Sequence, residues 1–242
     1  MRIVIVSSPK SGNHWIKCLM GQIYQLNWLG GDVKPLGSPA ELTRLIARGG
    51  FPDDSIFHQH SRFSKGLADT LEATPARIVT IVRDPYDVFV SLFAWVQNRV
   101  ANEGQTRRTR PRDILIGKPI DHPDVLNYLT HDFGDNIARA NDWLHSGRAV
   151  VVRYEALHQD PVAELTRATE QITPISPERI TDAIEACRVE NMRQMNEKFT
   201  WHIRTAKVGD SKEKLSAEHL AIFRDRYSDA IRSLGYEVRQ PG

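Results

Sequence analysis

Short runs rich in β-branched residues recur along this chain of 242 residues and alternate with segments of helical periodicity. The runs lie at 2–8, 55–60, 77–82 and 148–154. Each is bounded by glycine, proline or polar residues, as buried strands are. Strands that alternate with helices indicate a mostly parallel sheet. We therefore expect an α/β fold, a three-layer sandwich with a mostly parallel central sheet.

Helical periodicity fills the segments between and after these runs. It is clearest at 16–23, 85–100, 161–172 and 177–195, and in a long helix from Ser216. Asp84 and Pro85 are typical of an N-cap followed by a first helical position. The segments 98–113 and 199–215 follow neither period, which is typical of binding loops or of disorder. The length suits one large core, so we expect a single domain over 1–242.

Charge and composition exclude several partners. Lys and Arg total 32 against 30 for Asp and Glu, so we expect no nucleic-acid partner, and any anion-binding charge must be local. No apolar run is long enough for a transmembrane segment or a signal core, so we expect a cytoplasmic protein. Cys18 and Cys187 lie far apart. We expect no disulfide and no metal site from them, and a reducing environment. The sequence does not indicate the oligomeric state.

The turn SSPKSGNHW, residues 7–15, joins the first predicted strand to the first predicted helix. In a parallel sheet such a turn lies at the carboxyl end of its strand, where the N–H groups of the helix face an anion. Lys10 brings a positive charge but precedes Gly12, so the turn lacks the Gly-Lys-Ser/Thr ending of a Walker A loop and its magnesium ligand. We interpret it as an anion site; the alternative is an ordinary loop with a helix cap.

A second candidate site lies where the strand at 77–82 ends. Arg83 follows that strand, and on the next helix Asp87 and Ser91 lie four residues apart, which directs them to the same side. Arginine and serine together can clamp a phosphate. The alternative is that Arg83 pairs with Asp84 or Asp87.

These motifs resemble those of sulfotransferases that use 3′-phosphoadenosine 5′-phosphosulfate (PAPS). PKSGNHW at 9–15 is similar to the 5′-phosphosulfate loop Pro-Lys-Ser-Gly-Thr-Thr-Trp. Arg83 followed by Ser91 is similar to the 3′-phosphate motif. RYEAL at 153–157 resembles the Tyr-Glu-Asp segment, and RTAKVGDSKEKL at 204–215 resembles Arg-Lys-Gly-x-x-Gly-Asp-Trp-Lys. The four motifs occur in the family's order and span most of the chain.

The resemblance implies an α/β fold with a P-loop-like phosphosulfate-binding loop and a set of roles. The residues around the 5′-phosphosulfate would be Lys10, Ser11, Gly12, Asn13 and His14. Trp15 and Tyr154 would contact the adenine, and Arg83, Ser91 and Arg204 would hold the 3′-phosphate. The product would be 3′,5′-adenosine bisphosphate (PAP). A sulfuryl group carries one negative charge, so positive groups such as Lys10 can stabilise the departing phosphate, and we expect no metal.

His58 and His60 lie two apart at the end of the predicted strand 55–60, hence on one face. A histidine is suited to take the acceptor's proton, and His60 matches the family's base. Here His58 replaces the family's lysine. The alternatives are a metal-binding His-x-His pair, for which no third ligand is visible, and a hydrogen-bonded core histidine.

Other positions also depart from the family. Asn13 and His14 replace two threonines, Thr205 and Ala206 replace Lys-Gly, and Ser211 replaces a tryptophan. We expect an enzyme that transfers a sulfuryl group to a hydroxyl or amine of a small-molecule, carbohydrate or lipid acceptor.

Two other functions remain open at this point. One is a P-loop small-molecule kinase with Asp84 or Asp87 as metal ligand. The other is a nucleotide-binding module impaired in catalysis. The arginine-rich segment 98–113 is either an acceptor lid or a solvated loop.

Overall fold

The computed structural model describes residues 1–29, 39–103, 110–195 and 207–241. The chain forms two compact units. The first contains residues 1–83 and 142–192, and the second contains 84–141 and 193–242. The single domain over 1–242 stays a prediction.

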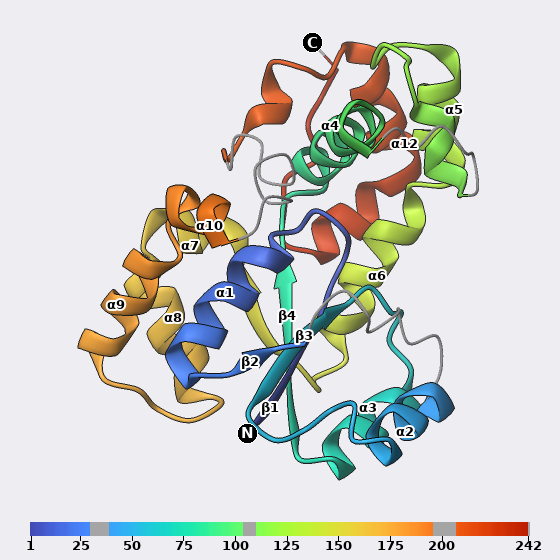
Figure 1. Cartoon of the computed structure of the whole chain (residues 1–242). Coiled ribbons are helices and arrows are strands. Elements are labelled where there is room, and N and C mark those ends of the chain that lie inside the picture. The colour runs from blue at the N-terminus through green and yellow to red at the C-terminus, as the bar shows by residue number, and fades with distance from the viewer. Residues whose placement is uncertain (30–38, 104–109, 196–206, 242) are drawn as a thin grey trace. The chain divides into compact units, whose positions relative to one another are not determined.

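A five-stranded sheet forms the centre of the first unit (Figure 1). The strands are β1 (Arg2–Val6), β2 (Asn27–Trp28), β3 (Ser55–Gln59), β4 (Ala76–Val82) and β5 (Val150–Arg153). Their order is β2-β3-β1-β4-β5, and all four pairings are parallel. The predicted parallel sheet is confirmed. Because every strand runs the same way, all five carboxyl ends lie at one edge, where loops bind ligands in such sheets.

Helices cover both faces of this sheet, which completes the three predicted layers. The helices of the first unit are α1 (Asn13–Tyr24), α2 (Pro39–Ala47), α3 (Lys65–Ala73), α7 (Tyr154–Gln159), α8 (Pro161–Glu170) and α9 (Pro177–Ala186). Val4 and Val6 of β1 pack in one core cluster with Leu42 of α2 and Leu71 of α3. On the other side of the strands lie α1, α8 and α9 (Figure 1).

The second unit is built from helices around an aromatic core. Its elements are α4 (Pro85–Glu103), η1 (Pro111–Leu115), α5 (Pro123–His131), η2 (Asp210–Lys212) and α12 (Ala217–Ser233), and α6 (Gly134–His145) runs from this unit into the first. Phe223 of α12 packs with Tyr86 at 4.3 Å and with Phe133 at 5.9 Å between ring centroids. Asp84 accepts from the Tyr86 N–H at 2.9 Å, which confirms the predicted cap. Among the described residues, no helix is both long enough and apolar enough to cross a membrane.

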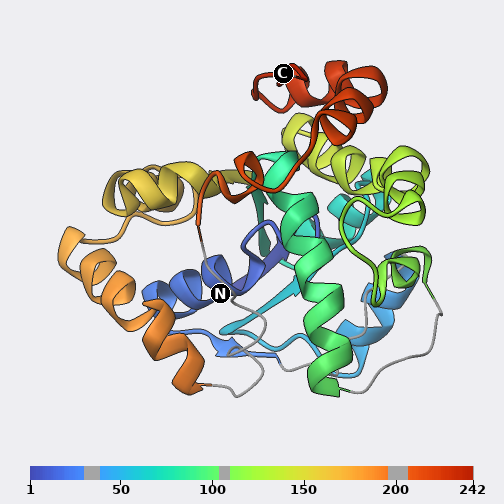
Figure 2. The same cartoon turned by 90° about the horizontal axis from the view of Figure 1, so that it is seen from above.

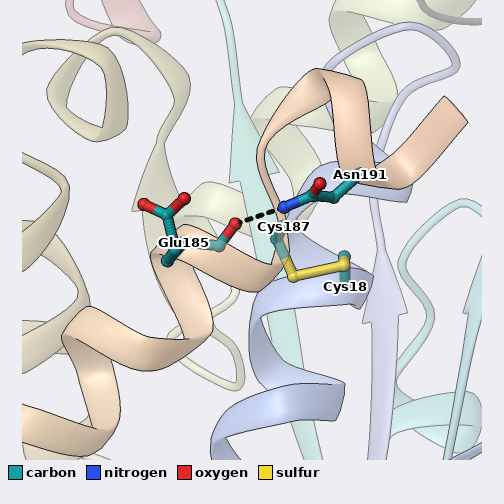
Figure 3. The surroundings of a disulfide bond; sticks show 4 residues. All are labelled: Cys18, Glu185, Cys187 and Asn191. Atoms are coloured by element: carbon teal, nitrogen blue, oxygen red, sulfur yellow. Dashed lines mark hydrogen bonds between the residues drawn. A yellow bond between two sulfur atoms is a disulfide. The ribbon is translucent and has the colours of Figure 1, made fainter. Parts of the chain in front are cut away.

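A disulfide joins Cys18 of α1 to Cys187, the residue that ends α9 (Figure 3). The expectation of unpaired cysteines is wrong, because α1 and α9 lie side by side (Figures 1 and 2) and bring together residues 169 positions apart. The cysteines therefore no longer argue for a reducing environment. The predicted helix 177–195 also ends at this point, and α10 (Val189–Met195) begins beyond it. There Asn191 donates to the Glu185 carbonyl at 2.9 Å (Figure 3).

Replacing both cysteines by serine is expected to lower the free energy of unfolding by about 2–5 kcal/mol, because the crosslink restricts a long loop in the unfolded chain. Urea unfolding with and without dithiothreitol measures the change. The reductant should destabilise the parent and leave the double variant unaffected. Two free thiols in the parent, titrated after unfolding without reductant, would contradict the pairing.

Lys17 lies one turn into α1 and is 7% exposed. Its Nζ lies 4.4 Å from the centre of the Trp28 ring. Burial lowers the pKa of Lys17 to about 8. The unfolded chain therefore binds more protons than the native one between pH 8 and 10.5, the ordinary pKa of a lysine. This group thus costs stability below pH 8, and the cost fades as pH rises through that window.

Lys17→Met is therefore expected to stabilise the protein at pH 7 by about 1–3 kcal/mol. The stabilisation should shrink between pH 8 and 10.5. Urea unfolding across that range measures it. A stabilisation that does not change with pH would show that packing, and not the buried charge, is responsible.

Candidate functional site

The turn between β1 and α1 has a backbone that only a few residue types favour. Lys10 has φ 68° and Gly12 has φ 108°, both in the left-handed region. A Cβ at Gly12 would lie 2.7 Å from the Tyr154 ring, so a side chain there would collide with the ring. No side chain caps α1 at Gly12. The amides of the first turn of a helix are the groups that bind the anion in anion-binding turns.

Asn13 holds this turn from within. Its side-chain amide donates to the Ser8 carbonyl at 2.9 Å, and its side-chain oxygen accepts from the Ser7 hydroxyl. All three residues are buried. The predicted place of Asn13 is beside the phosphosulfate. In the structure its side chain holds the turn itself, and a role in binding the phosphosulfate stays a prediction.

Arg83 lies directly after β4 and joins two parts of this site. It is 8% exposed. Its Nη1 donates to the Lys10 carbonyl at 3.2 Å, and its Cζ lies 4.1 Å from the centre of the Tyr154 ring. The first turn, the end of β4 and the start of α7 therefore meet at this guanidinium, which is a positive charge at the carboxyl edge of the sheet.

Three rings form an aromatic cluster next to the turn. The Trp15 ring centroid lies 5.8 Å from that of Tyr154 and 4.8 Å from that of His158, and the Tyr154 and His158 centroids are 4.7 Å apart. Part of His158 remains exposed, yet burial against these groups, followed by the charge of Arg83, lowers the pKa of its imidazole. His158 is not among the residues predicted from the sequence. Its position four residues after Tyr154 on a helix was the available signal.

His60 follows β3 and is oriented by the first turn. Its Nδ1 lies 2.9 Å from the Ser7 carbonyl. Because a carbonyl oxygen only accepts, Nδ1 carries the proton in the neutral ring, and Nε2 is the nitrogen with the lone pair. This is the tautomer that a general base with a reacting Nε2 requires.

His60 ends a row of three histidine rings. The His58 centroid lies 5.5 Å from that of His60 and 4.9 Å from that of His14. Within the described ranges, no group of three or more His, Cys, Asp and Glu side chains has a geometry that would hold a metal ion. The metal-binding interpretation of His58 and His60 therefore gains no support there.

The remaining predicted residues lie elsewhere. Ser91 is on α4 in the second unit, so its joint role with Arg83 stays a prediction. Arg204, Thr205 and Ala206 lie outside the described residues, as do 104–109 within the segment 98–113.

Asp87 of α4 has a structural role that the sequence did not reveal. Its carboxylate accepts from the N–H of Gly209 at 2.7 Å, and from the N–H and hydroxyl of Ser211 at 3.0 and 2.5 Å. The Asp84 carboxylate pairs with Arg239 at 2.6 Å. Both carboxylates are therefore engaged in holding the second unit together, which disfavours either as a metal ligand.

Comparisons with known proteins bear on this site. A family model described as a sulfotransferase domain matches residues 52–235, well over half of the chain. The turn at 7–15 precedes the matched residues, so its interpretation rests on its own sequence and geometry. A curated relative from Arabidopsis thaliana, cytosolic sulfotransferase 8, is 24% identical, and the alignment covers 89% of this chain and 72% of the relative.

Two solved structures resemble the fold. Mouse sulfotransferase SULT7A1, complexed with PAP, has a TM-score of 0.70 and 18% identity, with 96% of this chain and 84% of that chain covered. Retinol dehydratase, in complex with androsterone and inactive cofactor PAP, has a TM-score of 0.62 and 14% identity, and the match covers 100% of this chain and 84% of that chain. At these identities the likeness establishes the shared fold.

Proposed function

Because the chain belongs to the sulfotransferase domain family, we propose that it transfers a sulfuryl group from PAPS to a hydroxyl or amine of a small-molecule, carbohydrate or lipid acceptor. The observation that carries the proposal is the meeting of Lys10, Arg83 and His60 at the turn after β1. Arg83 donates to the Lys10 carbonyl, and the carbonyl of Ser7, in the same turn, sets the tautomer of His60. A phosphosulfate in this turn would therefore meet a positive charge and a base together.

Each group has a chemical task in this proposal. His60 Nε2 takes the proton of the acceptor as the acceptor's oxygen or nitrogen forms a bond to sulfur. The bond from sulfur to the phosphate oxygen breaks, and Lys10 with the amides of the first turn of α1 stabilises the charge that develops on that oxygen. The products are the sulfated acceptor and PAP. In this proposal Ser11 and His14 complete the 5′ site, and the motif resemblance assigns Arg83, Ser91 and Arg204 to the 3′-phosphate.

The aromatic cluster supports a purine site. Trp15 is half-buried beside the turn, and the face of an indole ring binds a flat adenine well. Tyr154 is buried, with Arg83 over its ring, so its contact with the adenine would be made by the ring edge. We add His158, which contacts both rings, to the adenine site. The structures of the mouse sulfotransferase and of retinol dehydratase are titled as complexes with PAP, which is consistent with this use of the fold.

Binding of PAP without metal, compared with ADP and Mg²⁺, tests the nucleotide assignment. At ten times its dissociation constant a ligand stabilises the native state by about 1.4 kcal/mol, which a thermal-shift measurement detects. We expect stabilisation by PAP in the presence of EDTA. Stabilisation by ADP with Mg²⁺ alone would favour the kinase alternative, which the engaged carboxylates of Asp84 and Asp87 already disfavour.

Arg83→Gln is expected to weaken PAP binding by about 10- to 100-fold, because it removes a charge-assisted contact with a phosphate. Isothermal titration measures this. Arg77→Gln, at an exposed position on the same strand, is the matched control and should bind PAP like the parent. Equal affinity in the Arg83 and Arg77 variants would refute the 3′-phosphate assignment.

The acceptor class and the location stay at the level of proposals. Retinol dehydratase is titled as a complex with androsterone, which makes small apolar alcohols reasonable first acceptors. The word cytosolic in the name of the Arabidopsis relative supports a cytoplasmic location.

A further inference from the structure

Arginines gather around Trp95 in the second unit, at residues that have no role in the proposed sulfuryl transfer. Trp95 lies on α4, and the guanidinium Cζ atoms of Arg99 and Arg112 lie 5.0 and 4.8 Å from the centre of its ring. Arg99 is on the same helix, and Arg112 is on η1. Stacking of this kind fixes the plane of a guanidinium and leaves its N–H groups directed outward from the ring edge.

Among the described residues, Asp113 is the carboxylate that pairs with an arginine of this cluster. Asp113 is fully buried. One of its oxygens accepts from Arg99 Nη2 at 2.8 Å, and the other accepts from the Arg110 backbone N–H at 3.0 Å. Asp113 therefore pairs with Arg99 through one oxygen and with the backbone through the other.

Arg112 is left with more positive than negative neighbours. Burial lowers the pKa of its guanidinium, and the charges of Arg110 and Arg99 lower it further, while Tyr128 and Asp113 act in the opposite direction with smaller effect. Arg112 forms no ion pair with any carboxylate of the described residues. Its Nε is buried and makes no hydrogen bond within the part of the chain that the structure describes.

A half-buried guanidinium that is not paired with a carboxylate of the described residues favours binding of an anion. Burying a charge is costly unless it is paired, and a planar guanidinium matches the oxygens of a phosphate, sulfate or carboxylate. We propose that Arg112, held on Trp95 and assisted by Arg110, forms a binding site for a phosphate or sulfate group. Such a group comes either from a free inorganic ion or from an organic phosphate or sulfate ester.

The ring of Trp95 provides a local probe. The protein is labelled with 5-fluorotryptophan, and its five tryptophans give separate ¹⁹F signals that are assigned with Trp95→Phe and Trp15→Phe. Inorganic phosphate and phenyl phosphate are titrated at constant ionic strength. Each ¹⁹F signal reports on its own surroundings. Phosphate bound at the turn after β1 therefore shifts the signal of Trp15, and phosphate bound at Arg112 shifts the signal of Trp95.

We expect both probes to move the Trp95 signal of the parent, and tighter binding of phenyl phosphate would identify an ester as the better ligand. Arg112→Gln should weaken the response at Trp95 by at least about tenfold. Arg226→Gln, which removes an exposed charge of the same unit, should leave it unchanged. Arg112→Lys keeps the charge but loses the planar fork of N–H groups. Its affinity for the probes should therefore lie between that of the parent and that of Arg112→Gln. A Trp95 signal that neither probe moves, or that responds equally in folded Arg112→Gln, would overturn the proposal.

Discussion

Lys10→Met is expected to lower kcat/KM for sulfuryl transfer by about 100- to 1000-fold, because it removes the positive charge that stabilises the departing phosphate oxygen. The substitution keeps the length of the side chain. Methionine at φ 68° meets the same backbone cost as lysine, so the turn should keep its shape. Initial rates at varied PAPS measure the loss, and thermal unfolding checks that the fold is retained.

Lys65→Met is the matched control for this substitution. Lys65 is exposed and pairs with Asp69 within α3 at 2.7 Å, so the same chemical change there should leave the rate close to that of the parent. An activity of Lys10→Met above about one tenth of the parent's would contradict the assigned role, since such a loss corresponds to only about 1.4 kcal/mol.

His60→Gln is expected to lower kcat by about 100- to 10,000-fold, the usual contribution of a positioned general base. Glutamine can still donate to the Ser7 carbonyl, which now accepts from His60 at 2.9 Å. The turn should therefore remain in place, and PAP should bind as it does to the parent. A fall in kcat with unchanged PAP affinity separates a lost base from a damaged binding site.

His131→Gln provides the matched control for the loss of the ring. The Nδ1 of His131, at an exposed position of α5, also lies near a backbone carbonyl, that of Asn127 at 3.0 Å. This variant should keep the rate of the parent. If His60→Gln retained more than about one tenth of the parent's kcat, another group would have to be the base.

The sheet and the first turn were predictable because their signals are local. Strands buried on both faces read as continuous β-branched runs, and a polar turn after the first of them lies at the carboxyl edge. Short helices were not predicted. The helices α2 and α3 have nine residues each, too few turns for a clear period. The strand β2, with two residues, is shorter still.

Contacts between distant segments could not be predicted. The pairing of Cys18 with Cys187 requires knowing that α1 packs against α9. Asp87 was considered as a partner for Arg83, but its hydrogen-bond partners come from residues 122 and 124 positions later. Likewise, the tautomer of His60 depends on Ser7, 53 positions away. The residue types of the site were visible in the sequence, whereas their orientation depended on such tertiary contacts.

Transfer of ³⁵S from labelled PAPS to an acceptor tests the central claim most directly. The parent, Lys10→Met and His60→Gln are incubated in EDTA with a panel of alcohols, phenols, sugars and amines, and PAP is measured alongside the labelled product. We predict a labelled product and an equal amount of PAP with the parent, without metal, and a loss of both in the two variants. PAP binding with no transfer to any class of acceptor, or transfer from the parent that both variants match, would contradict the account.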